Sequence, residues 1–176
     1  MDKSTAQPKK GPIAIGLSIG RCGTLSMCEA LKLLYCGQCY HWSRVPSTQE
    51  YLSLLSKATH GKDSHDDWRG YLDGFSAAVG SPVTGYWHIL KDVYPDAKLF
   101  LLRRDGESWY KSFQETALAI FKYHHTPVYY LCYYTWPALY TKIPFLINVY
   151  HKLLGKDFMN LGKYELISRF EADCFH

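Results

Sequence analysis

The chain has 176 residues, a length that suits one domain and leaves little room for a second. Hydrophobic residues make up 47% and charged residues 20% of the chain, so a packed core is expected and a disordered protein is excluded. The net charge of +4 at pH 7 fits a small anionic ligand but is too weak to predict nucleic-acid binding.

The N-terminal residues and the cysteines predict a cytoplasmic protein. Residues 1–11 are polar and then basic, as in a flexible tail, and residues 12–176 are expected to form a single domain. The apolar run Ile13–Ile19 is too short for a spanning helix, and six cysteines are too few for a disulfide scaffold. Membrane contact through residues 127–150, an almost uncharged stretch interrupted by prolines, is the weaker alternative. The sequence does not indicate an oligomeric state.

Hydrophobic periodicity and turn residues predict strands that alternate with helices. In chain order we expect a strand at 13–17, helices at 24–36 and 51–58, a polar turn at 62–70, a strand at 75–79, a helix at 83–93, a strand at 98–103, and helices at 105–121, 127–154 and 158–173. The strand at 98–103 contains the continuous apolar run 99–102, which is typical of a parallel strand buried on both faces. This alternation predicts an α/β fold with a parallel sheet.

The glycine-containing turn after the first strand predicts an anion-binding site. Residues 18–23 lead into the helix that begins at Thr24, so backbone N–H groups and the positive end of the helix dipole meet there. Arg21 adds a charged planar donor, and Thr24 and Ser26 add hydroxyl groups. The alternative is an ordinary structural turn, because short glycine motifs are weak signals.

The turn lacks the features of a magnesium-dependent triphosphate site. It contains no Gly-Lys-Ser/Thr, and no acidic residue ends the 98–103 strand to hold Mg²⁺. A kinase that uses a nucleoside triphosphate is therefore disfavoured, and the turn fits a phosphate bound without metal.

A second basic site follows the 98–103 strand. Arg103 and Arg104 end the strand, Asp105 is expected to cap the next helix, and Ser108 and Ser112 share one face of that helix. Both sites lie at the carboxyl ends of strands, where open α/β sheets bind ligands, so a ligand with two separated phosphates would use both. The alternative is a solvated basic corner.

These two motifs resemble those of the sulfotransferase family, in its P-loop sulfotransferase-like branch. That branch typically carries Gly-(Leu/Phe)-Pro-Arg-Thr-Gly-Thr-x-Ser, and the frame Arg-x-Gly-Thr-x-Ser is kept here. The matching segment is Gly20, Arg21, Cys22, Gly23, Thr24, Leu25 and Ser26. The second motif of the family is an arginine followed eight residues later by a serine, a spacing that Arg104 and Ser112 fit. The ordered similarity covers roughly residues 13–120.

The resemblance implies a three-layer P-loop NTPase-like fold with a central, mainly parallel sheet flanked by helices. It further implies an enzyme that transfers a sulfuryl group from 3′-phosphoadenylyl sulfate (PAPS) to a small-molecule hydroxyl or amine acceptor, without a metal. The segment 20–26 would hold the 5′ phosphosulfate, with Arg21 also acting in catalysis, and Arg104 and Ser112 would hold the 3′-phosphate.

The general base is not assigned by the resemblance. Many relatives carry an acid just after the strand that here ends at Val79, but this chain has Gly80 and Ser81. The remaining candidates are His41, Asp73 and, as the weakest, His88, and each also has a purely structural reading. Relatives usually continue past the last helix with another strand, so the C-terminal part of the domain is expected to be incomplete here.

Two other functions stay open from the sequence. One is a non-catalytic nucleotide-binding paralogue of the same fold, which the glycine at position 80 favours. The other is a thiol redox protein that uses the Cys-x-x-Cys pair Cys36 and Cys39, although this pair follows a helix instead of starting one.

Overall fold

We describe the fold from a computed structural model, for residues 11–44, 48–123, 126–127 and 137–173. Most of the expected N-terminal tail, and residues 128–136 of the expected 127–154 helix, lie outside the described residues. The elements in chain order are β1 (Ala14–Gly16), α1 (Thr24–Tyr35), β2 (Gln38–His41), η1 (Trp42–Arg44), α2 (Gln49–Thr59), α3 (His65–Tyr71), β3 (Phe75–Val79), η2 (Val83–Tyr86), α4 (Trp87–Val93), β4 (Lys98–Phe100), α5 (Gly106–Phe113), η3 (Gln114–Leu118), α6 (Ala119–Tyr123), α8 (Pro137–Leu154), η4 (Phe158–Asn160) and α9 (Lys163–Asp173).

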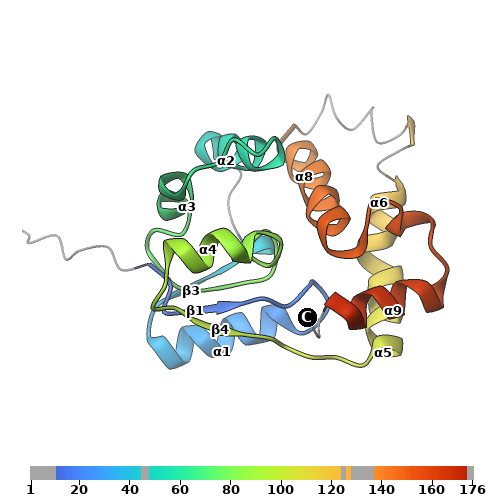
Figure 1. The fold of residues 1–176 in the computed structure, drawn as a ribbon, viewed down its shortest axis with the longest axis horizontal. Coiled ribbons are helices and arrows are strands. Elements are labelled where there is room, and N and C mark those ends of the chain that lie inside the picture. The colour runs from blue at the N-terminus through green and yellow to red at the C-terminus, as the bar shows by residue number, and fades with distance from the viewer. Residues whose placement is uncertain (1–10, 45–47, 124–125, 128–136, 174–176) are drawn as a thin grey trace, which may run out of the picture.

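The four strands form one parallel sheet in the order β2-β3-β1-β4 (Figure 1). Ala14 of β1 pairs with Ala77 of β3 on one side and with Lys98 of β4 on the other. The expected α/β fold with a parallel sheet is confirmed.

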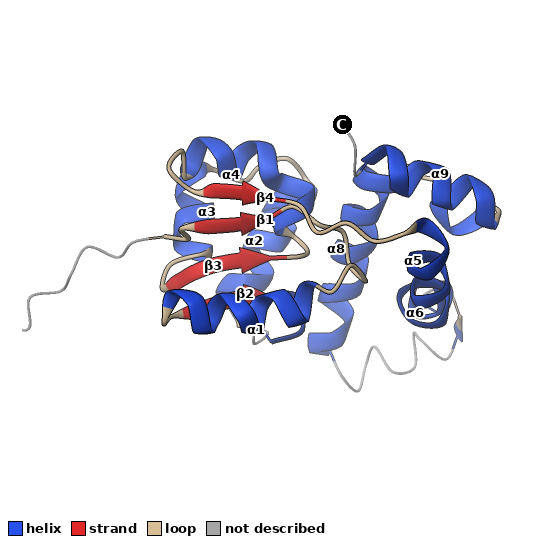
Figure 2. Cartoon of the chain, turned by 90° about the horizontal axis from the view of Figure 1, so that it is seen from below, coloured by secondary structure: helices blue, strands red, loops and turns tan. Residues whose placement is uncertain are grey.

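The two faces of the sheet are covered by different helices (Figure 2). Ile15 and Ala78 belong to a buried cluster with side chains of α2, α3 and α4. Ala14 and Ala77, one residue earlier on the same strands, pack instead with Cys28 of α1. This alternation along β1 and β3 makes three layers, since successive side chains of a strand point to opposite faces.

The remaining helices lie beyond the carboxyl ends of the strands, as both views show. They surround a second, aromatic cluster that includes Trp109, Phe113 and Phe158. Helix α8 contributes to both clusters, with Val149 in the sheet-side cluster and Tyr150 in the aromatic one. The strand ends therefore face a helical wall, and the chain between β1 and α1 lies where the two parts meet.

The strand at 98–103 is shorter and less buried than its sequence predicts. β4 ends at Phe100 and lies at an edge of the sheet, where Leu99 and Leu101 are each 39% exposed. The expectation of burial on both faces was wrong because it treats a continuous apolar run as a central strand, whereas the strand order decides which strands lie at an edge.

Two further expectations about local structure are corrected. Residues 62–70, expected as a polar turn, include all but the last residue of α3, which begins with a capping box between Ser64 and Asp67 and buries Trp68 completely. The short strand β2 was not expected, and its buried residues Cys39 and Tyr40 give only a two-residue apolar signal. The expected helix 105–121 forms α5, a π-helical turn η3 and α6 in succession.

Candidate functional site

We call residues 18–26 the donor loop: they comprise the turn that leads into α1 and the first three residues of that helix. The donor loop begins at a fully buried serine, Ser18. The Ser18 hydroxyl accepts a hydrogen bond from the Leu102 amide at 2.5 Å, and the Thr84 hydroxyl donates to the Ser18 carbonyl at 2.8 Å. These bonds fix the start of the loop between the end of β4 and η2. The roles of Ser18 and Thr84 were not predicted from the sequence, because Thr84 and Leu102 are 66 and 84 positions away from Ser18.

The conformation of the donor loop leaves the start of α1 open. Arg21 has φ +77° and Gly23 has φ +80°, both in the left-handed region. A Cβ at Gly23 would meet nothing within 4 Å, and the N-cap of α1 makes no side-chain capping bond in the described structure. The first amides of this 12-residue helix are thus available to an anion, as the sequence predicts.

The structure brings the two basic motifs together. The Arg21 Nε donates to the Ser112 Oγ at 2.9 Å, across 91 positions of sequence. Arg104 Nη1 donates to the backbone carbonyl of Arg21 at 2.6 Å. All three residues predicted to hold the two ends of one ligand therefore lie at a single corner, between the donor loop and α5.

Two aromatic residues, not anticipated from the sequence, support the donor loop from the helical side. The indole Nε1 of Trp109 donates to the Gly20 carbonyl at 3.1 Å, and the ring is stacked between Phe113 and Phe170 at centroid distances of 4.8 and 4.2 Å. The Tyr150 hydroxyl lies so close to Gly20 that a Cβ there would clash with it. Gly20 is thus required by close packing. A glycine in a loop sequence does not reveal by itself whether close packing or an unusual backbone conformation requires it.

His41 lies beside the start of α1. Its Nε2 is 3.1 Å from the Thr24 Oγ1. Its Nδ1 accepts a hydrogen bond from the Ser43 amide at 3.3 Å and lies 2.9 Å from the Ser43 hydroxyl. Burial and, to a smaller extent, the Arg44 cation lower the pKa of His41 below its ordinary value, so the ring is neutral at pH 7. A Cβ at Gly80 would lie 3.8 Å from the His41 Nε2, so the absence of a side chain at this position keeps the space next to that nitrogen open.

The other predicted site residues are more scattered. Asp73 precedes the amino end of β3, whereas Gly80 follows its carboxyl end, so the structure places Asp73 at the opposite end of the strands from the donor loop. Leu25 and Ser26 are exposed on the first turn of α1, and Cys22 is buried in the aromatic cluster. His88 is exposed on α4, so of the three candidate bases it is His41 that contacts the donor loop.

The Cys-x-x-Cys pair is split between two environments. Cys36 is exposed at the C-cap of α1, and Cys39 is buried in β2. Burial and the neighbouring Cys28 thiol raise the pKa of Cys39, which disfavours the thiolate that redox exchange requires. The redox alternative has no support from this geometry.

Two features are absent from the described ranges, residues 11–44, 48–123, 126–127 and 137–173. No group of three or more His, Cys, Asp or Glu side chains is suited to a metal ion within these ranges. No helix in them combines the length and the apolar character needed to cross a membrane. Residues 128–136 of the stretch considered for membrane contact lie outside the described residues.

Comparison with known proteins agrees with the geometry. The family profile described as "Sulfotransferase domain" matches residues 14–172, from the first strand to the last helix. No curated protein matches the chain significantly. The family match includes β1, the donor loop, His41, Arg104 and Ser112 in one continuous span. The chain belongs to the sulfotransferase domain family.

Proposed function

We propose that the chain binds PAPS between the donor loop and the start of α5 and transfers the sulfuryl group to a hydroxyl or amine of a small acceptor. The observation that carries this proposal is the convergence of Arg21, Arg104 and Ser112 through two hydrogen bonds of 2.9 and 2.6 Å. A ligand with phosphates at both ends of a ribose needs two anion sites at one corner of the sheet, and the family supplies the reaction class.

The residues present fit such a ligand. The uncapped start of α1 and the open position over Gly23 offer backbone amides to one phosphate. Arg104 and Ser112 offer a guanidinium and a hydroxyl to the other. When bound, PAPS supplies an activated sulfuryl group on a phosphate leaving group.

The donor loop stabilises the charge that develops on the leaving phosphate. The Arg21 guanidinium and the first amides of α1 are fixed donors there, so little reorganisation is needed during transfer. The Thr24 hydroxyl, now 3.1 Å from His41, is placed to donate to the same phosphate.

His41 takes the proton of the acceptor. In the structure the Ser43 amide donates to the His41 Nδ1 at 3.3 Å, which places the ring proton on Nε2, toward Thr24. In the role of base the ring takes its other tautomer, in which Nδ1–H donates to the Ser43 hydroxyl and Nε2 is unprotonated. Once Thr24 donates to the phosphate, Nε2 is free to accept a proton from an acceptor in the space beside Gly80. Asp73 has no part in this scheme, because it lies at the amino ends of the strands, away from the donor loop.

Calorimetry with adenosine 3′,5′-bisphosphate tests the donor site. We expect the wild-type protein to bind this nucleotide and the Arg104→Ala variant to bind at least about tenfold more weakly, the scale of one charged hydrogen bond. Arg69→Ala, which removes an exposed arginine from α3, is the matched control and should leave the affinity unchanged.

Equal nucleotide affinity in the wild type and in Arg104→Ala would overturn the donor site. A transfer assay with labelled PAPS and a panel of phenols, alcohols and amines then separates an enzyme from a non-catalytic paralogue. Binding without transfer to any acceptor would favour the paralogue.

A further inference from the structure

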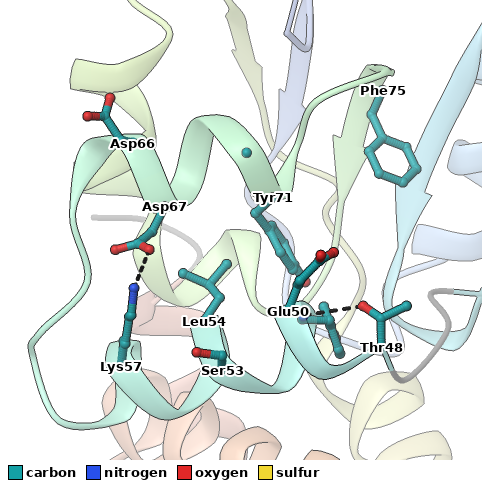
Figure 3. A pocket seen from close by; sticks show the side chains of 11 residues that line it. Thr48, Glu50, Ser53, Leu54, Lys57, Asp66, Asp67, Tyr71 and Phe75 are labelled. Atoms are coloured by element: carbon teal, nitrogen blue, oxygen red, sulfur yellow. Dashed lines mark hydrogen bonds and ion pairs between the residues drawn. The ribbon is translucent and has the colours of Figure 1, made fainter.

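A cavity of about 570 Å³ lies between α2 and α3, away from the donor loop (Figure 3). Helix α3, helix α2 and the first residue of β3 form its walls. The lining residues, which define what we call the α2–α3 cavity, are Thr48, Glu50, Tyr51, Ser53, Leu54, Lys57, Asp66, Asp67, Gly70, Tyr71 and Phe75.

The floor of the cavity is aromatic and held in place from behind. The rings of Tyr51 and Tyr71 are stacked, with centroids 5.3 Å apart and planes at 13°. The Tyr71 hydroxyl donates to the Tyr40 hydroxyl at 2.5 Å, and Tyr40 donates to the Ser81 carbonyl at 3.2 Å. Burial raises the pKa of Tyr40 and Tyr71, so these hydroxyls keep their protons. Because the rings are fixed before any ligand arrives, binding to them costs little ordering.

The rim of the cavity is acidic, although the whole chain is basic. Glu50, Asp66 and Asp67 face one cation, Lys57, on this wall. Asp67 is paired with Lys57 at 2.6 Å, and its hydrogen bonds with Lys57 and Ser64 lower its pKa to about 2, so it is ionised at pH 7. Asp66 is paired with Arg69 outside the cavity wall, whereas Glu50 has no ion pair with any described residue. An unpaired carboxylate above an aromatic floor is suited to a positive charge carried on an apolar body.

The wall of the cavity includes a glycine, Gly70, which contributes no side chain. Gly70 belongs to α3, and a Cβ built on it would meet nothing within 4 Å. Any larger side chain at this position would project into open space on the cavity wall. Because Gly70 is in a helix and does not have a positive φ, replacing it costs no backbone strain.

We propose that the α2–α3 cavity is a second ligand site, which binds a small organic cation: an ammonium group on an aromatic or aliphatic body. The ammonium pairs with Glu50 at the rim, and the apolar body packs on Tyr71 and Phe75. The site is separate from sulfuryl transfer, because Phe75 is at the amino end of β3 while the donor loop and Gly80 lie at the carboxyl ends of the strands.

Calorimetric titration of the full chain with tryptamine tests this site without any nucleotide. We expect saturable binding of one tryptamine per chain, and binding of indole-3-propionate, which has a similar ring but an anionic tail, to be at least about tenfold weaker. Glu50→Gln should weaken tryptamine binding about fivefold, the scale of one exposed ion pair. The control Glu115→Gln, an exposed glutamate of η3, should not change it.

Gly70→Leu should weaken tryptamine binding by at least about tenfold because the added side chain narrows the cavity, while leaving the unfolding temperature unchanged or higher, since leucine favours a helix more than glycine does. Equal binding of the two indoles would overturn the proposal, as would tryptamine binding that survives both Gly70→Leu and Glu50→Gln. Tryptamine binding that is lost in His41→Ala but kept in Gly70→Leu would place the amine at the donor loop and overturn it too. Because no arm uses a nucleotide, none of these outcomes depends on whether the chain transfers sulfuryl groups.

Discussion

At the residue scale, the proposed chemistry depends on His41 and on the glycine beside it. His41 contacts the Thr24 hydroxyl of the donor loop, and its lowered pKa keeps it neutral at pH 7. Gly80 has no side chain, which leaves space beside the imidazole Nε2. A neutral imidazole at this position can accept a proton, whereas a protonated one cannot.

The first prediction concerns the pH dependence of sulfuryl transfer. Because His41 must be neutral to act and its pKa is lowered, the rate should rise with pH through a midpoint below the ordinary histidine value of about 6.5 and stay level above it. His41→Ala should lower the rate by about 100-fold or more and remove this rise, while the affinity for adenosine 3′,5′-bisphosphate changes little. Steady-state rates from pH 5 to 8 provide the measurement.

The matched control for His41→Ala is His88→Ala, which removes an exposed histidine of α4. Its pH profile should equal that of the wild type. A low-pH limb that persists in His41→Ala would show that another group is the base.

At the element scale, α5 connects the second basic motif with the core. Its N-cap was predicted: the Asp105 side chain accepts from the Ser108 amide at 3.1 Å, which confirms the expected start of the helix. The role of Trp109 could not be predicted, because an aromatic residue in a helix gives no sign of which carbonyl its indole will reach. Its stacked neighbours Phe113 and Phe170 come from two helices.

A second prediction tests how firmly Trp109 holds the donor loop. Trp109→Phe keeps the stacking but leaves the Gly20 carbonyl without its donor, so it should lower the free energy of unfolding by about 1–3 kcal/mol. Trp109→Ala also opens a cavity in the aromatic cluster and should cost about 3–5 kcal/mol.

Urea denaturation measures both Trp109 variants. Trp87→Phe, at a tryptophan that is 43% exposed, is the control and should change the free energy of unfolding by no more than about 0.5 kcal/mol. If Trp109→Phe proved as stable as the wild type, the indole bond to the loop would contribute nothing.

At the scale of the whole molecule, α8 holds the sheet and the helical wall together. Val149 lies in the sheet-side cluster with its side chain against Gly85 of η2, and Tyr150, one residue later, lies against the donor loop. A Cβ at Gly85 would lie 2.9 Å from a Val149 methyl carbon. The approach of α8 to η2 therefore requires the glycine.

The third prediction is a double-mutant cycle across this contact. Gly85→Ala should lower the free energy of unfolding by about 1–3 kcal/mol through overpacking. Adding Val149→Ala removes the clashing methyl groups, so the double variant should be more stable than the sum of the two single changes implies, by at least about 0.5 kcal/mol. Additive losses would mean that α8 does not press on Gly85 as the structure shows.

Local sequence was sufficient for the strand–turn–helix at the donor loop, the cap of α5, the parallel sheet and the family motifs, because these depend on neighbouring residues and on short spacings. Only the tertiary structure decided that Arg21 meets Ser112, that His41 lies at the donor loop while Asp73 lies at the opposite end of the strands, and that β4 is an edge strand. The same holds for the α2–α3 cavity, whose residues are ordinary helix positions until α2 and α3 pack. The reason is physical: backbone preferences act over a few residues, whereas strand order and helix packing are set by burial between segments far apart in the chain.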